Sequence, residues 1–404
     1  MRIGIEVQRL LRTKKYGIEV VALNLLRHLP AADPANDYIL FTRNGDDAAC
    51  LSGLQNIRVV ILPALTYADW EQVQLPRAVK REGIDLLLCT GNTAPRFTNV
   101  PTVLTLHDVI SFERPLFGER GQSLYQRFGN AYRTVVSRIA MSRAARIVSV
   151  SAQERLLIAD RFPSIAPKLS FINNGVDRTL FEAVPERDVR NVLQRYGLPR
   201  SYFLHFGNTD PKKNSEFVLR SYAEYAGMTA NPLPLVLTGL ERALVLQWLN
   251  RTGSSHHAPL IFTPGHIPHR SVPALYQSAI GLLFPSTRES FGLPVLEAMA
   301  SGVPVIALPH SSLPEVTEDA VLFTIDGDTA HFAGQMLRLH REPQHAVTLV
   351  QRGRRRAELF AWESSAVRYS ELIAAAGRVL EPRTPQQRHH TIPTFQYTSP
   401  TPLS

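Results

Sequence analysis

The chain has 404 residues, more than one hydrophobic core usually supports, so two domains are expected. Hydrophobic residues make up 44% and charged residues 20%, values typical of a globular protein, and no apolar run approaches the roughly 20 residues of a membrane-spanning helix. The formal net charge is +9, but the basic residues are scattered without the pattern of a common RNA- or DNA-binding module, so we expect no nucleic-acid partner.

Two features indicate a cytoplasmic protein. Cys50 and Cys89 are the only cysteines, too few for a disulfide framework or a cysteine-based metal site. The N-terminal residues enter a strand-like segment directly, which leaves no room for a signal peptide. We therefore expect a reducing, cytoplasmic environment.

Short apolar runs alternate with amphipathic helical stretches through the first half of the chain. In chain order they predict strand 2–7, helix 17–29, strands 38–42 and 57–62, helix 70–81, strands 85–89 and 102–106, helix 122–143, strand 147–150, helix 152–161 and strand 169–172. Strands separated by helices indicate right-handed crossovers and a parallel sheet.

The pattern restarts near residue 200, after a stretch at 184–200 that contains proline and many charges. The second half predicts strand 202–206, helix 214–226, strand 235–238, helix 241–251, strands 260–263 and 281–284, helix 293–300 and strand 303–307. We expect an α/β protein with two Rossmann-like, doubly wound domains that face each other across a cleft. Ligands should bind where the carboxyl ends of the strands meet that cleft.

These patterns divide the chain into an N-terminal domain at 1–183, a C-terminal domain at 184–361, a closing helix at 362–380 and a tail at 381–404. The tail has five prolines and many polar residues, so it cannot bury enough apolar area to order itself and is expected to be disordered.

The most informative segment runs from residue 285 to residue 306. A buried strand ends at Pro285, a polar loop follows, and a helix begins near Leu293, where Pro294 suits the first turn. Free backbone amides at the start of that helix would face the cleft beside the positive end of the helix dipole, which suits a diphosphate or sugar oxygens. These amides belong to Phe291, Gly292 and Leu293.

Two glutamates lie in the same segment. Glu289 is in the loop and Glu297 is one turn inside the helix, with seven residues between them. Taken alone, each would ordinarily be a solvated surface residue. A carboxylate also accepts hydrogen bonds from sugar hydroxyls, so both are candidates to contact one ligand.

This segment, Pro-Ser followed by Phe-Gly-Leu-Pro, Glu-Ala and Gly-Val-Pro-Val, resembles the donor-binding signature of the family 4 glycosyltransferases, retaining enzymes of the GT-B fold. The resemblance covers about residues 1–375 and implies that the closing helix crosses back onto the N-terminal domain. It implies that Glu289 contacts the donor sugar and Glu297 the ribose of the nucleotide. The neighbouring donor-binding residues are then Ser290, Phe291, Gly292 and Leu293.

The segment 205–214, His-Phe-Gly-Asn-Thr-Asp-Pro-Lys-Lys-Asn, is similar to a second donor loop of the family. The resemblance implies that Gly207 and Lys212 lie at the donor and that Lys213 neutralises the diphosphate as it leaves. Many members carry arginine where this chain has Asn208. Either Lys212 supplies the second positive charge, or the leaving group is stabilised less.

In the first half, Gly17 opens a helix, and the resemblance places it near the donor phosphate, although a single glycine often marks only a turn. The segments 70–76 and 105–110 look like bacterial members that build O-antigen and capsule chains. This implies that His107 lies near the donor sugar and that Asp108 orients it or binds acceptor. Without the family, a strand-end histidine is more often structural. The catalytic candidates are His107, Asp108, Lys213 and Glu289.

Other motifs are interpreted structurally. Asp326-Gly327-Asp328 spells a metal-binding triplet of another glycosyltransferase fold, but it directly precedes a helix, so Asp328 is expected to be a helix N-cap. The histidines form no helical pair with a supporting carboxylate, so we predict neither a metal nor another cofactor. Glu315 either caps a strand or contacts ligand, and both roles stay open.

The resemblance implies transfer of a sugar from a nucleotide diphosphate donor to a growing glycan, with retention at the anomeric carbon; GDP-mannose is the leading donor by similarity. A nucleotide-sugar epimerase of the same fold and a non-catalytic sugar- or nucleotide-binding protein are the alternatives.

A further hypothesis places the enzyme at the cytoplasmic face of the inner membrane, where a lipid-linked glycan would be the acceptor. The basic loop Arg9–Lys15 and the amphipathic helix 122–143 would then bind anionic lipid. A helix packed on the sheet shows the same periodicity, so that explanation stands beside it.

Overall fold

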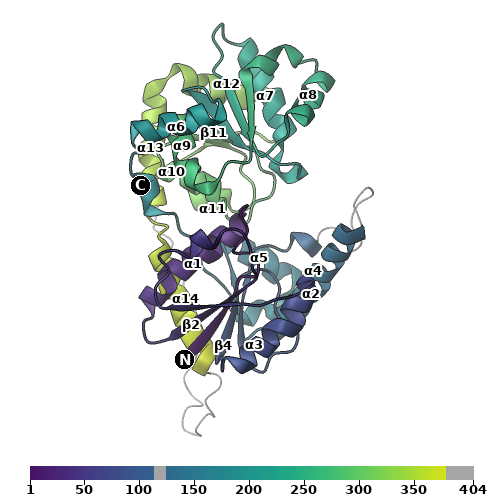
Figure 1. The fold of residues 1–404 in the computed structure, drawn as a ribbon. Helices are drawn as coiled ribbons and strands as arrows, with labels where there is room; N and C mark the ends of the chain where they lie inside the picture. The colour runs from purple at the N-terminus through teal and green to yellow at the C-terminus, as the bar shows by residue number, and fades with distance from the viewer. Residues whose placement is uncertain (113–123, 379–404) are drawn as a thin grey trace, which may run out of the picture.

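The computed structural model describes residues 1–112 and 124–378, and its strands form two separate parallel sheets, each in its own lobe (Figure 1). The first sheet has seven strands in the order β3-β2-β1-β4-β5-β6-β7. Its strands are β1 (Arg2–Glu6), β2 (Asp37–Thr42), β3 (Ile57–Ile61), β4 (Leu86–Cys89), β5 (Thr102–Leu106), β6 (Arg146–Ser149) and β7 (Leu169–Phe171). The predicted α/β class is confirmed.

The second sheet has six strands in the order β10-β9-β8-β11-β12-β13, again all parallel. Its strands are β8 (Tyr202–Phe206), β9 (Leu235–Thr238), β10 (Ile261–Gly265), β11 (Ala279–Phe284), β12 (Val305–Ala307) and β13 (Leu322–Phe323). In both sheets the order reverses beside the first strand of the lobe, which places a topological switch point in each.

The helices of the first lobe are α1 (Gly17–Ala32), α2 (Tyr67–Asp69), α3 (Leu75–Arg81), α4 (Leu124–Arg143) and α5 (Ala152–Arg161). The predicted helix over 70–81 is interrupted: a π-helical turn at Trp70–Gln74 precedes α3. Pro76 has no N–H to donate to the preceding turn, and the wider turn buries both Trp70 and Glu71 completely.

The second lobe contains α6 (Glu186–Tyr196), α7 (Ser215–Gly227), α8 (Arg242–Arg251), α9 (Val272–Ser278), α10 (Leu293–Ala300), α11 (Leu313–Thr317), α12 (Thr329–Arg341) and α13 (Pro343–Ala357). The sequence did not predict α6, because within its charged run only Val189 and Leu193 are buried. Asp328 accepts a hydrogen bond from the His331 amide at the start of α12, which confirms its role as N-cap.

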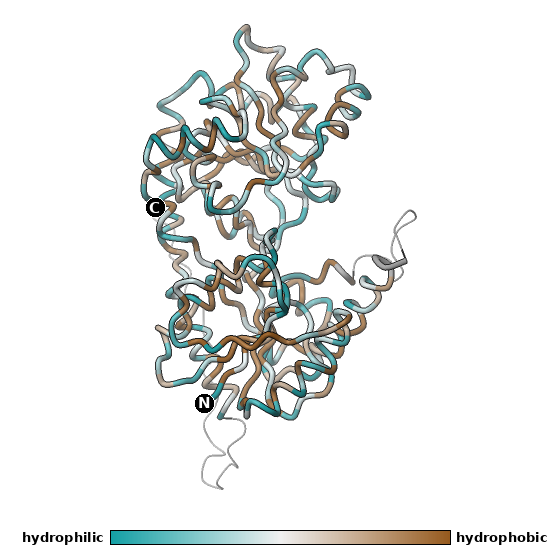
Figure 2. The backbone as a smooth tube through the Cα atoms, in the orientation of Figure 1, coloured by the Kyte–Doolittle hydropathy of each residue, from teal (hydrophilic) through white to brown (hydrophobic). Residues whose placement is uncertain are grey.

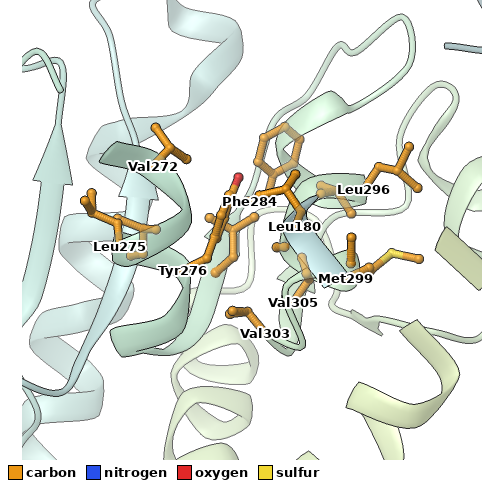
Figure 3. Close-up of a cluster of buried hydrophobic side chains, with 14 of the residues drawn as sticks. Leu180, Val272, Leu275, Tyr276, Phe284, Leu296, Met299, Val303 and Val305 are labelled. Atoms are coloured by element: carbon orange, nitrogen blue, oxygen red, sulfur yellow. The ribbon is translucent and has the colours of Figure 1, made fainter. Parts of the chain in front are cut away.

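Buried strands and amphipathic helices form the core of each lobe. Figure 2 shows hydrophobic colour along the central strands and hydrophilic colour on peripheral helices and loops, the pattern expected when helices cover both faces of a parallel sheet. In the second lobe, side chains from α9, β11 and α10 pack together around Tyr276, Phe284 and Leu296 (Figure 3). This packing fixes where α10 begins.

The last helix, α14 (Trp362–Gly377), crosses back to the first lobe and packs on α1, β4 and β5, as the resemblance implied (Figure 1). Tyr369 and Ile373 join the first lobe's core, and the Tyr369 hydroxyl lies 3.0 Å from Thr105 Oγ1. The crossing is tight, because a Cβ atom on Gly175 would lie 2.3 Å from the Trp362 backbone nitrogen.

Some predictions lie outside what these observations test. The domain boundaries at 183/184 and 361/362 stay predictions. The tail 381–404 and residues 122–123 of the predicted basic helix lie outside the described residues. Within the described ranges, every helix is too short or too polar to cross a bilayer.

Candidate functional site

The loop after β11 leads into α10 at the carboxyl edge of the second sheet. Gly292 is the residue before the helix and has a φ of 92°, a left-handed conformation, and a Cβ atom there would lie 2.6 Å from Leu313 Cδ2. The Phe291 side chain is buried against Phe360 and therefore anchors the turn from inside. Ser290 contributes its backbone oxygen to a contact with the other lobe.

The start of α10 has the features expected of an oxygen-binding turn. Leu293 is its first residue and Pro294 its second, and no side chain caps the helix. Among the described residues, no acceptor is hydrogen-bonded to the backbone N–H groups of Phe291, Gly292 or Leu293. Unsatisfied N–H groups at a helix start attract anionic or hydroxyl oxygens.

Lys213 and Glu289 come together across two loops. Lys213 Nζ donates to Glu289 Oε2 at 2.8 Å, with only 17% and 19% of the two side chains exposed. The ammonium also lies 5.0 Å from the centre of the Phe284 ring. The Thr287 amide donates to the Lys212 carbonyl at 2.9 Å, which joins the loop after β8 to the loop after β11. The structure thus assembles the two predicted catalytic groups of this lobe.

Glu297 accepts hydrogen bonds from side chains of its own lobe. The Tyr276 hydroxyl donates to Glu297 Oε2 at 3.2 Å and to the Pro294 carbonyl at 3.0 Å, and His269 Nε2 donates to Glu297 Oε1 at 3.3 Å. The hydrogen bond to Glu297 raises the pKa of His269. Sequence reasoning did not find Tyr276 or His269, because neither belongs to the motif and only folding brings α9 beside α10.

The remaining predicted residues of the loop after β8 have separate roles. Gly207 permits close packing, since a Cβ atom there would lie 2.7 Å from Leu240 Cδ1. Asn208 is exposed, and its side-chain oxygen accepts from the Asp210 amide at 2.9 Å, so it shapes the turn. Lys212 is half-buried. Asn208 therefore offers no cationic substitute for arginine, and the lysines are the positive charges of this loop.

The predicted residues of the first lobe lie at the carboxyl edge of its sheet. Gly17 is exposed at the start of α1, and a Cβ atom there would meet nothing within 4 Å, so internal packing does not require glycine. His107 directly follows β5, and its Nε2 donates to the Thr90 carbonyl at 2.8 Å. Burial lowers the pKa of His107. The neutral ring therefore keeps Nδ1 as an acceptor.

Asp108 is half-buried beside His107, and its Oδ1 accepts from the Ile110 amide at 3.2 Å. This bond closes the turn after β5. Its two predicted roles, orienting His107 and binding the acceptor, stay predictions.

The two lobes meet at the start of α5. Glu315, on α11 of the second lobe, accepts from the Ala152 and Gln153 amides at 2.9 and 2.7 Å, so it caps a helix of the first lobe. Arg288 forms two hydrogen bonds to Glu154, at 2.7 and 2.9 Å. The Ser151 hydroxyl donates to the Ser290 carbonyl at 2.8 Å. The Ser-x-x-Glu pattern at 151–154 indicates a helix start but not its partner.

A buried acidic network lies behind the first lobe's carboxyl edge. Glu71, in the π-helical turn, accepts from the hydroxyls of Thr93, Tyr132 and Tyr67. Glu6 ends β1 nearby. Desolvation, and then repulsion by Glu71, raise the pKa of Glu6 to about 8. Sequence reasoning missed this network, whose only local signal is a glutamate at the end of an apolar strand.

Glu315→Gln is expected to loosen the contact between the lobes. A carboxamide keeps one good acceptor and loses the charge that favours a helix N-terminus, at a cost of about 1–2 kcal/mol. Small-angle scattering should show a larger radius of gyration, and thermal unfolding should become less cooperative. Glu318→Gln is the matched control, since its side chain is 61% exposed in an ion pair with Arg356. Scattering and unfolding curves identical to wild type in Glu315→Gln would contradict this role.

Glu6→Gln is expected to flatten the pH dependence of stability. Between about pH 4.5 and about pH 8 the folded chain keeps a proton on Glu6 that the unfolded chain has lost. The stabilisation is therefore complete below the unfolded value and is lost as the pH rises through the folded one, by at most about 1.4 kcal/mol per unit. Denaturant unfolding across this range measures the slope, with exposed Glu358→Gln as control; an unchanged slope in Glu6→Gln would refute the assignment.

Two family models match consecutive parts of the chain. The Glycosyltransferase Family 4 model matches residues 16–180, and the Glycosyl transferases group 1 model matches residues 194–356. The first match covers β2 to β7 of the seven-stranded sheet, and the second contains the loops with Lys213, Glu289 and Glu297.

Curated relatives are similar at modest identity. The O-antigen chain mannosyltransferase B of Escherichia coli is 27% identical over 269 residues, 65% of this chain and 67% of the relative. The serotype-specific mannosyltransferase WbdA of Escherichia coli is 28% identical over 55% of this chain, which spans only 28% of that longer protein. The D-inositol 3-phosphate glycosyltransferase of Salinispora arenicola is 30% identical over 59% of this chain and 57% of the relative.

Solved structures share the whole architecture. Anabaena Alr3699/HepE in complex with UDP and glucose superposes with a TM-score of 0.69 at 19% identity, over 92% of this chain and 99% of that one. The sucrose-phosphate synthase of Thermosynechococcus elongatus gives 0.72 at 20% identity, over 94% and 99%. At these identities the likeness establishes the GT-B fold. The two domain matches show a Family 4 glycosyltransferase domain followed by a group 1 glycosyl transferase domain, so the chain is a glycosyltransferase built from these two domains.

Proposed function

We propose that the protein transfers a hexosyl group from a nucleoside diphosphate sugar to a glycan, with retention at the anomeric carbon and without a metal ion. The observation that carries the proposal is the Lys213–Glu289 pair beside the uncapped start of α10. A cation and a set of unsatisfied amides meet there at the carboxyl edge of a doubly wound sheet, where such folds bind nucleotides.

The donor diphosphate would exchange partners with Glu289. Its oxygens would take the Lys213 ammonium and the amides at the start of α10, and the released Glu289 carboxylate would accept from hydroxyls of the donor sugar. Glu297, whose orientation Tyr276 fixes, would accept from the ribose hydroxyls. Lys213 then stabilises the charge that develops on the diphosphate as the glycosidic bond breaks.

Retention does not require an enzymic carboxylate nucleophile in this site. A retaining glycosidase holds two carboxylates close together, one as nucleophile and one as acid. Here Glu289 is paired with Lys213, and Glu297 is engaged by Tyr276 and His269. We propose that the acceptor hydroxyl attacks the anomeric carbon from the face that the diphosphate leaves and gives its proton to the departing diphosphate oxygen.

GDP-mannose is the donor that we propose, because two of the relatives, the O-antigen chain mannosyltransferase B and the longer WbdA, are named mannosyltransferases. A neighbouring structure was solved with UDP and glucose, so the base and the sugar are tested separately. A thermal-shift screen of GDP- and UDP-sugars at one concentration separates them, since the ligand that binds more tightly stabilises the folded state more. Free nucleotide together with a glycosylated product excludes both the epimerase and the non-catalytic protein, neither of which the comparisons support.

Alanine variants of the three charged residues should separate binding from turnover. Glu297→Ala should weaken donor binding, because the ribose loses its acceptor. Lys213→Ala should lower kcat about 100-fold or more while changing donor affinity less, because its charge acts mainly as the leaving group departs. Glu289→Ala should lower both. Titration calorimetry and initial rates measure these effects, with exposed Lys80→Ala as the control. Wild-type affinity and rate in all three variants would refute the site.

Peripheral contact with an anionic membrane stays a proposal. On α4 one face packs inward through Val136, Ala140 and Met141, while Phe128 and Val135 are exposed. The exposed side and the loop Arg9–Lys15 are both basic, and each basic residue near an anionic surface contributes about 1 kcal/mol. The protein should therefore float with anionic liposomes at low salt, remain behind with neutral ones, and dissociate at high salt. Negligible flotation with both kinds would indicate an enzyme that meets its acceptor by diffusion.

A further inference from the structure

A small basic pocket lies between the ends of β1 and β2 in the first lobe. Its empty volume is about 260 Å3, including its open mouth. The pocket is lined by Gln8, Arg9, Leu11, Arg12, Arg43 and Asn44. Arg43 and Asn44 follow directly after β2, and Gln8 and Arg9 follow shortly after β1, so the pocket is part of the carboxyl edge of the sheet.

The lining combines three guanidinium groups with no acidic side chain. The adjoining loop contains two acidic residues outside the lining, Asp46, which is exposed, and Asp47, which is paired with Lys15 at 2.5 Å. Glu6, behind the pocket, is kept protonated by burial because its pKa is raised to about 8, so it does not offset Arg9 at neutral pH. The residues that line the pocket therefore carry a net positive charge.

Two buried donors of residues that line the pocket have no hydrogen-bond partner among the described residues. Only 7% of Gln8 is exposed, and its Nε2 makes no hydrogen bond among the described residues. The same holds for the buried Nε of Arg9. A buried donor without an acceptor costs about 1–3 kcal/mol.

The pocket is preformed. The Arg43 amide donates to the Gln8 carbonyl at 3.2 Å, and the Asp47 amide donates to the Leu11 carbonyl at 3.0 Å, so the two loops are tied at both ends. The Arg9 guanidinium lies 5.2 Å from the centre of the Tyr67 ring, which restrains it from the other side. Little ordering of loops is then needed when a ligand binds.

We propose that this pocket binds a phosphate group of the acceptor. The inference rests on the proposed transfer reaction and names the chemical class of its second substrate. Three guanidinium groups and a carboxamide match a tetrahedral, doubly charged group that accepts several hydrogen bonds, whereas a single carboxylate would leave most of these donors unused.

The position of the pocket fits an acceptor better than a donor. The charged residues of the predicted donor site, Lys213, Glu289 and Glu297, belong to the other lobe, and Gly17 is the one predicted donor residue that follows the loop of the pocket. His107 follows β5, which is separated from β1 by β4 alone, so at about 4.8 Å per strand the pocket lies on the order of 10 Å from His107. A phosphate about one sugar away from the attacking hydroxyl would reach it. The loop between β1 and α1 faces the second lobe, because burial and then the positive charge of Lys14 lower the pKa of His266 in that lobe.

Inorganic phosphate is the first probe, measured by titration calorimetry at constant ionic strength. The Lys213→Ala background removes a principal positive charge of the donor site, so that the binding that remains reports on the pocket. In that background, Arg43→Ala and Arg12→Ala, two exposed positions, should each weaken phosphate binding about tenfold. Arg77→Ala, an exposed arginine of α3 outside the pocket, should leave it unchanged. Equal phosphate affinity in all of these variants would overturn the proposal.

Two further arms identify the source of the phosphate and keep the proposals separable. A soluble hexose phosphate and vesicles of phosphatidic acid are compared as competitors of inorganic phosphate; competition by either, lost in Arg43→Ala, supports the pocket and says whether its phosphate is soluble or lipid-borne. Competition by neither would overturn it. With Lys213 left as in the wild type, Arg43→Ala should keep the wild-type affinity for the donor and the wild-type, slow rate of donor hydrolysis by water. The KM for a phosphorylated acceptor should rise. If the wild-type protein binds no nucleotide sugar, the proposed transfer reaction is refuted, whereas the phosphate result still stands.

Discussion

The capping of α5 by residues of the second lobe is the contact on which the arrangement of the candidate site between the two lobes depends. Glu315 satisfies two amides at the start of α5, and Arg288 neutralises Glu154, which is almost fully buried. A buried carboxylate without its cation would be strongly destabilising, so the lobes cannot separate here without cost. Arg288 is also the immediate neighbour of Glu289. The contact that joins the lobes therefore fixes the loop that is expected to hold the donor sugar.

The charges of that loop are arranged as exchangeable pairs. Lys213 and Glu289 satisfy one another at 2.8 Å, which avoids leaving either charge partly buried and unpaired. A diphosphate sugar carries both a negative group for the lysine and hydroxyls for the glutamate, so it can replace this pair with two better matched ones. Tyr276 holds Glu297 apart from that exchange. Binding and orientation of the donor would then follow from one rearrangement.

The first lobe differs from the second in the placement of its acidic groups. They are buried in a hydrogen-bonded network and do not belong to a recognisable sequence motif. Glu71 enters the interior through the π-helical turn and collects three hydroxyl donors, while Glu6 stays protonated beside it. Tyr67 links this network to Arg9 and thereby to the basic pocket. Loops at the carboxyl edge are thus supported from below by a hydrogen-bonded layer, which is what the proposed acceptor pocket would require.

Local signals in the sequence determined the architecture and part of the donor site. Alternating apolar runs predicted both sheets, and strands β5, β8 and β9 and helices α5 and α10 begin and end at the predicted residues. Asp328 was identified as an N-cap because capping depends on neighbours in the chain. The spacing of Glu289 and Glu297 around a helix start likewise identified two candidate ligand contacts.

Only the tertiary structure decided which groups meet. The Lys213–Glu289 pair, the Tyr276 bond to Glu297 and the capping of α5 by Glu315 join residues 76, 21 and more than 160 positions apart. The π-helical turn before α3 buries Trp70 and Glu71 in the interior, which the local pattern of the segment did not indicate. The basic pocket exists because two loops after adjacent strands are hydrogen-bonded together. Such contacts depend on the three-dimensional path of the chain, and the sequence pattern at any one position does not contain it.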